Sequence, residues 1–174
     1  MANAKYATSF ALAVFLLLGI GAAAAQDEKS SAQVQAEKNE VKNFVLTSDK
    51  LDKYAAAVNA IRKVQKDDPA LKKKMDDDNA RNPSNTIADS VANIEKYPPV
   101  ADALKNAGLP PRGFVVMTFT LINAAAEVQK KKAGTAQDPD SALPENVTFV
   151  EKNYDRIKKI FNGASDSPET APPK

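Results

Sequence analysis

Apolar residues recur at steps of three and four over most of residues 44–163, which is the period of amphipathic helices. The first helix is expected to follow Thr47, since threonine is a good N-cap residue. Asp68 and Pro69 end that helix and begin a second one, because aspartate can cap and proline suits the first helical turn. We expect this second helix to be short, since the acidic residues 76–78 are unfavourable near a helix C-terminus.

Four further helices are predicted along the rest of the pattern. Residues 85–97 and 98–107 form two of them, and 144–163 carries one regular apolar stripe that ends at a glycine. Residues 111–133 form the most apolar element, expected to be central. Its β-branched and aromatic positions 114–122 also suit a strand, but the Pro-Pro start and the alanine-rich continuation favour a helix. The fold class predicted is all-α, a single compact domain of about five or six helices in an orthogonal or irregular bundle.

The first 25 residues are predicted to be a signal peptide. A lysine at position 5 precedes the apolar run 10–20, and Ala23 and Ala25 then form a small-x-small cleavage pattern. We expect cleavage between Ala25 and Gln26. An uncleaved anchor is the alternative, but the run is shorter than the about 20 residues that span a membrane.

The remaining ends are polar. Residues 26–43 are rich in Gln, Glu, Lys, Ser and Asn without an apolar period, which predicts a flexible N-terminal segment. Residues 164–174 contain several prolines and polar residues and are predicted to be a disordered tail. The helical domain is therefore expected to cover 44–163.

Composition then removes several kinds of chemistry. The chain has no cysteine, histidine or tryptophan. Disulfides, thiol nucleophiles, imidazole acid/base catalysis and Cys- or His-based metal sites are therefore excluded. With 24 Lys and Arg against 22 Asp and Glu, the net charge of +2 offers no strongly basic surface, so we expect no nucleic-acid partner.

The acidic residues give no clear catalytic or metal site. The clusters at 76–78 and 138–140 lack the alternating ligand spacing of a calcium loop. The other acids considered are predicted on polar helix faces, where ordinary surface charges belong: Asp89, Glu95, Asp102, Glu127 and Glu151. We assign no catalytic residue, no cofactor-binding residue, no metal ligand and no cofactor.

One candidate ligand pocket lies on the predicted central helix. Polar side chains sit there among large apolar ones, and could orient a mostly apolar ligand between helices; the residues are Phe114, Met117, Thr118, Leu121 and Asn123. The alternative is that Thr118 and Thr120 return their hydroxyls to the backbone while Asn123 faces solvent. Tyr54, Tyr97 and Tyr154 are expected at core edges with their hydroxyls in water.

Three segments also carry a resemblance: LTSDKLDKYAAAVNAIRK at 46–63, EKYPPVADALKNAGLPPRGFVVMTFTLINAA at 95–125 and LPENVTFVEKNYDRIKKI at 143–160. They resemble a group of small exported all-helical bacterial proteins of uncharacterised function, over about 46–162. The resemblance implies an exported helical domain and supplies no catalytic or binding residues.

The sequence favours a non-catalytic periplasmic or secreted module that binds a protein partner or a small apolar ligand. We favour this function because cysteine and histidine are absent, while the apolar pattern specifies an ordered core. The alternatives are a small-ligand carrier with a pocket beside the central helix, and a metal-independent enzyme that uses carboxylate or lysine residues. Contact with a membrane is expected only through the signal segment before cleavage.

Overall fold

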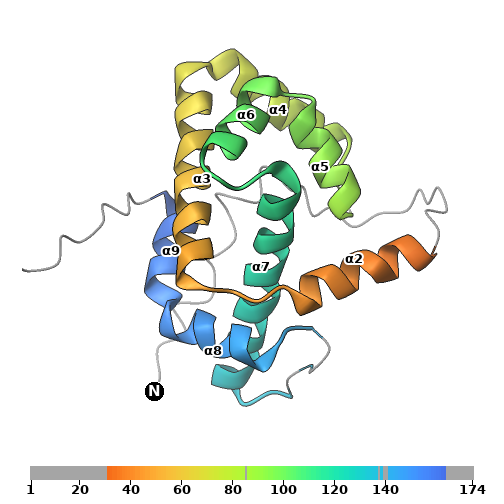
Figure 1. The fold of residues 1–174 in the computed structure, drawn as a ribbon, viewed down its shortest axis with the longest axis vertical. Helices are drawn as coiled ribbons and strands as arrows, with labels where there is room; N and C mark the ends of the chain where they lie inside the picture. Colours follow the sequence, from red (N-terminus) through yellow and green to blue (C-terminus); the bar gives the residue numbers. More distant parts are fainter. Residues whose placement is uncertain (1–30, 85, 137, 139–140, 164–174) are drawn as a thin grey trace, which may run out of the picture.

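A computed structural model describes residues 31–84, 86–136, 138 and 141–163 of the chain, and over these residues every regular element is an α-helix. The helices form one compact domain (Figure 1), which confirms the all-α prediction. The predicted count of about five or six helices is wrong, since the described residues form eight. Their bounds are α2 Ser31–Asn43, α3 Ser48–Asp67, α4 Pro69–Arg81, α5 Ile87–Glu95, α6 Pro98–Asn106, α7 Pro111–Ala133, α8 Pro144–Lys152 and α9 Tyr154–Asn162. The predicted signal peptide and C-terminal tail lie outside the described residues.

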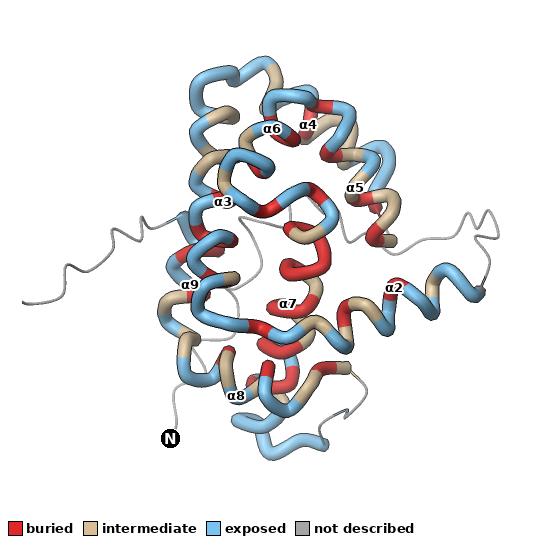
Figure 2. Tube along the Cα trace, viewed as in Figure 1, coloured by how far each residue is buried: buried red, intermediate tan, exposed pale blue. Residues whose placement is uncertain are grey.

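Helix α7 is the centre of the fold. It contacts α2, α3, α5, α6 and α8, and Figure 2 shows its buried turns in the middle of the molecule. Phe114, Val115 and Met117 are fully buried on it, so its apolar residues face neighbours on several sides. Residues 114–122 thus form part of a helix, and the alternative of a strand there is wrong. Burial from several directions explains why such β-branched residues are accommodated in a helix.

Helix α3 joins this centre through an aromatic pair. The ring of Tyr54 stacks on that of Phe114 with centroids 5.1 Å apart, and its hydroxyl lies 3.0 Å from Oγ1 of Thr118. Tyr54 is fully buried, and this burial raises the pKa of its hydroxyl. Tyr97 is also buried and donates its hydroxyl to the Asp78 carboxylate. The expectation that these two hydroxyls lie in water is therefore wrong, because Tyr54 bonds to α7 and Tyr97 bonds to α4.

Helix α4 is longer than the sequence pattern predicts. It continues through residues 76–78 and ends at Arg81. Lys72 and Lys73 form i,i+4 ion pairs with Asp76 and Asp77, at 2.5 and 2.6 Å. These local pairs offset the unfavourable position of the carboxylates near the helix end.

The last predicted helix is two helices. The helix is interrupted at Asn153, whose φ of −107° and ψ of 16° lie outside helical geometry. Helices α8 and α9 therefore replace the single helix expected over 144–163. Both the backbone amide and the side-chain amide of Asn153 donate to the carbonyl of Phe149, at 3.0 and 2.9 Å, and so close the end of α8. The apolar stripe does not reveal this break, since both helices face the same core.

The segment predicted as flexible over 26–43 contains helix α2 from Ser31 onward. Its C-terminal half is held by long-range contacts: Val41 is buried, and Glu40 pairs with Arg112 of α7. Thr120 of α7 also donates its hydroxyl to the carbonyl of Val41 at 3.2 Å. This helix depends on packing rather than on an apolar period of its own, which is why the sequence pattern misses it.

The predicted helix caps agree with the structure. The Oγ1 of Thr47 accepts from the amide of Lys50, and a carboxylate oxygen of Asp68 accepts from the amide of Leu71. Gly108 ends α6 with a φ of +75°, a conformation that glycine adopts without steric cost. Local chemistry thus fixes these helix boundaries.

Candidate functional site

The five residues of the predicted pocket do not line one cavity. Phe114, Met117, Thr118 and Leu121 are at most 1% exposed and belong to the packed core. Thr118 donates its hydroxyl to the carbonyl of Phe114 at 2.8 Å, as the alternative interpretation expects. Asn123 is half-buried and lies apart from the other four, along the outer side of α7.

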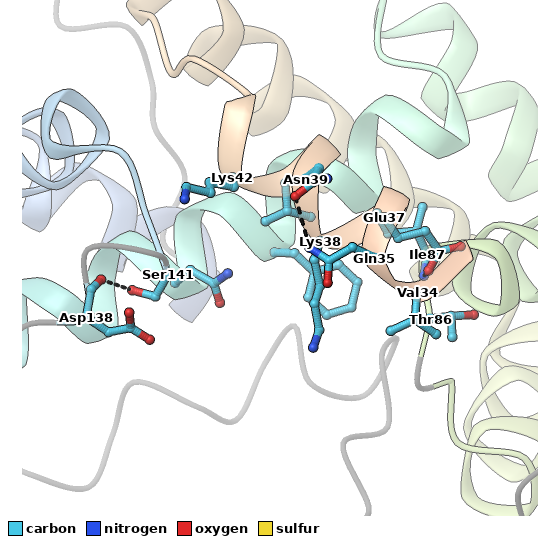
Figure 3. A pocket seen from close by; sticks show the side chains of 13 residues that line it. Val34, Gln35, Glu37, Lys38, Asn39, Lys42, Thr86, Ile87, Asp138 and Ser141 are labelled. Atoms are coloured by element: carbon cyan, nitrogen blue, oxygen red, sulfur yellow. Dashed lines mark hydrogen bonds between the residues drawn. The ribbon is translucent and has the colours of Figure 1, made fainter. Parts of the chain in front are cut away.

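A cleft of about 650 Å³ does open beside α7, and Asn123 is part of its lining. We call it the α2–α7 cleft (Figure 3). Helix α2 forms one wall, α7 supplies Phe119 together with Asn123, and the start of α5 closes one end. Asp138 and Ser141, which follow α7 in the chain, lie at the opposite end. The site is therefore assembled from α2, the start of α5, and α7 with the segment that follows it.

The wall formed by α2 is fixed to α5 by a buried carboxylate. Glu37 is 8% exposed, and its two oxygens accept from the amides of Ile87 at 2.9 Å and Ala88 at 3.1 Å. These amides are the first in α5, where the helix dipole favours a negative charge. The sequence does not single out Glu37, because the amides that bond to its carboxylate lie some 50 residues further along the chain.

A second buried carboxylate fixes the opposite end of the cleft. Glu127 of α7 is 2% exposed and accepts from Ser141 Oγ at 2.7 Å and from the Asp138 amide at 2.9 Å. Lys130 Nζ donates to the same carboxylate at 2.7 Å. The hydrogen bonds from Lys130 and Ser141 hold the pKa of Glu127 below its usual value. The prediction that Glu127 lies on a polar outer face is therefore wrong.

Removing the charge of Glu127 tests this contact. Glu127→Gln is expected to lower the free energy of unfolding by about 2 kcal/mol at pH 7, because charged hydrogen bonds are lost. Since the folded pKa is depressed, the charge of Glu127 stabilises the fold above the pKa of the unfolded chain. This contribution disappears as the pH falls through the folded pKa. Urea unfolding at pH 7 and at pH 3 measures both effects.

The control for this prediction is Glu95→Gln, at an exposed position at the end of α5. That variant is expected to change the free energy of unfolding by less than about 0.5 kcal/mol. If the two variants lose the same stability at pH 7, or if the loss in Glu127→Gln grows towards pH 3, the assigned role of Glu127 is wrong.

The carboxylates of Glu37, in the lining, and of Glu127, behind it, are thus occupied by protein donors and hold the walls of the cleft in place. No cluster of three or more acidic side chains suited to a metal occurs within the described part of the chain. Asn123 differs from the carboxylates, since its side-chain amide has no hydrogen-bond partner within the described residues. Its amide can donate and accept hydrogen bonds in the cleft.

No protein-family model matches the chain, and neither the curated proteins nor the solved structures give a match. Among the described residues, no helix combines the length and apolarity that crossing a membrane requires.

Proposed function

We propose that the protein is a non-catalytic binding module whose ligand site is the α2–α7 cleft. The observation that carries the proposal is a cleft of about 650 Å³ beside the central helix. Ligand sites in proteins typically measure about 300–1,000 Å³ and combine an apolar lining with a few polar groups. The occupant that suits a concave site of this size is a small molecule.

The lining supports this proposal. Val34 and Phe119 are half-buried apolar side chains, and Ile87 is buried beside them at the end of the cleft. Asn123 adds an amide that no described residue engages. A ligand that covers Phe119 and bonds to Asn123 would gain both apolar burial and orientation.

The walls support it as well, because they are held in place without a ligand. Glu37 fastens α2 to α5, and Glu127 fastens the segment that contains Ser141. A site formed in advance avoids part of the entropic cost of ordering its residues on binding. We further propose that the protein acts outside the cytoplasm, in the periplasm or the medium, which the sequence of residues 1–25 favours.

The proposal is tested by a ligand screen that compares two tryptophan variants. Asn123→Trp fills the cleft, whereas Asn59→Trp adds the same bulk on the exposed face of α3. A library of small amphipathic molecules is screened by saturation-transfer NMR at about 1 mM each. This concentration detects ligands with a Kd near about 1 mM, which corresponds to a binding free energy of about −4 kcal/mol. We expect ligands that bind the wild type and Asn59→Trp but not Asn123→Trp, with both variants folded by circular dichroism. Ligands that bind all three proteins equally, or a screen without any ligand, would contradict the proposal.

A further inference from the structure

The charges that line the α2–α7 cleft are not compensated equally. Its charged residues are Glu37, Lys38, Lys42 and Asp138. Both oxygens of Glu37 are already held by α5 amides, and Lys42 and Asp138 each have a partner. Lys38 is different, because its ammonium has no ion pair within the described residues. The lining therefore holds one ammonium group, that of Lys38, which no described residue engages.

Lys38 is placed to reach a ligand. It lies on α2, one residue after the anchored Glu37, and Figure 3 shows it between the Ser141 end and the Thr86 end of the lining. Across the cleft, α7 presents Asn123, whose side-chain amide carries two further N–H donors. An ammonium and an amide that face the same cleft are donors, and an anionic oxygen group accepts from both.

The negative charge of Glu37 does not cancel this preference. Its carboxylate is 8% exposed and points at the first amides of α5 at 2.9 and 3.1 Å. The partial positive charge at the N-terminus of α5 offsets it. Arg112 similarly pairs with Glu40 on the neighbouring turn of α2. The acidic groups of α2 are thus compensated within the protein, whereas Lys38 is not.

The rest of the lining includes an apolar wall, so a ligand that fills the cleft needs an apolar part as well. Val34 and Phe119 are half-buried, and Val41 and Ile87 are buried beneath them. Each methylene that a ligand buries against such a surface contributes about 0.8 kcal/mol in other systems. A purely polar anion, such as inorganic phosphate, would leave this apolar wall uncovered.

We infer that the α2–α7 cleft binds a single-chain amphipathic anion, a carboxylate on a medium-length apolar chain, with Lys38 and Asn123 at its head group and Val34 and Phe119 along its chain. This inference rests on the proposed function and deepens it by assigning the chemical class of the ligand. It requires no reaction of the bound molecule.

Three probes that share one apolar chain test the inference: octanoate, octanol and octyltrimethylammonium. Each is titrated into the ¹⁵N-labelled protein and followed by NMR, for the wild type, Lys38→Gln and the control Lys159→Gln, an exposed lysine on α9. We expect octanoate to bind about fivefold more tightly than octanol, which is the size of effect that an exposed charge pair gives. The cationic probe is expected to bind least. Lys38→Gln should remove the advantage of octanoate and leave octanol unchanged, while Lys159→Gln behaves as the wild type.

The outcomes separate this inference from the proposed function. If octanol or the cationic probe binds as tightly as octanoate, or if Lys38→Gln leaves octanoate binding unchanged, the assigned ligand class is wrong. The same conclusion follows if octanoate does not bind. The cleft itself would still be a ligand site if Asn123→Trp abolished the binding of those other probes or of ligands found in the library screen.

Discussion

Phe114→Ala is expected to lower the free energy of unfolding by about 4 kcal/mol, close to the largest loss that one core truncation gives. Phe114 lies in the first turn of α7, is fully buried, and stacks on Tyr54 of α3 with ring centroids 5.1 Å apart. Its loss removes apolar burial and leaves a cavity that surrounding helices fill only partly. Urea unfolding followed by circular dichroism measures the loss.

Phe119→Ala is the matched control, since Phe119 lies on the same helix but is half-buried in the lining of the cleft. We expect it to lose about 1 kcal/mol, because less area is removed from the core and solvent can enter the space. Equal losses in the two variants would contradict the placement of Phe114 in the core and of Phe119 at the cleft.

Asn146→Ala is expected to cost about 3 kcal/mol, because it leaves two backbone groups without partners. Asn146 of α8 is 1% exposed and accepts from the amide of Leu46 at 2.8 Å. Its amide also donates to the carbonyl of Phe44 at 2.7 Å. The side chain thus supplies hydrogen-bond partners for two backbone groups of the irregular segment between α2 and α3. Urea unfolding gives the overall loss, and hydrogen exchange at the Leu46 amide reports the local one.

Thr148→Ala is the control for Asn146, because Thr148 is exposed on the same short helix. It is expected to change stability by less than about 0.5 kcal/mol and to leave Leu46 exchange unaltered. Should Asn146→Ala retain slow exchange at Leu46, the bridge between α8 and residues 44–46 would not be the source of its stability.

Local signals in the sequence were sufficient for much of the helical framework. Thr47 and Asp68 cap their helices through side-chain bonds to amides three residues away. The apolar residues of 111–133 identify the most buried helix, and Gly134 ends it with a φ of +69°. In each case the determining contacts lie within a few residues, so the sequence pattern carries the information.

The remaining features depend on partners that are distant in the chain. Glu37 bonds to residues 50 and 51 positions away, and Asn146 bonds to residues 100 and 102 positions away. Helix α2 forms against α5 and α7 through such contacts. Neither composition nor periodicity in the polar segment 26–43 indicates which groups will meet it, so a helix there was not predictable.

The candidate site shows the same division. Positions 114, 117, 118 and 121 follow the three- and four-residue steps of one helix face, and that face is the core. Phe119 and Asn123 are four residues apart on another face, which lines the cleft. The sequence pattern thus identified the helix that borders the cleft and one residue of the cleft lining, Asn123. The cleft could not be predicted because its other wall, α2, was expected to be flexible.

Ligands of this protein are expected to bind in the α2–α7 cleft. Intermolecular nuclear Overhauser effects between a bound ligand, octanoate or the tightest binder from the library, and the isotope-labelled protein test it most directly. We expect contacts from the ligand's apolar protons to the ring of Phe119 and the methyl groups of Val34, on opposite walls of the cleft. Contacts confined to residues outside the cleft lining would contradict it.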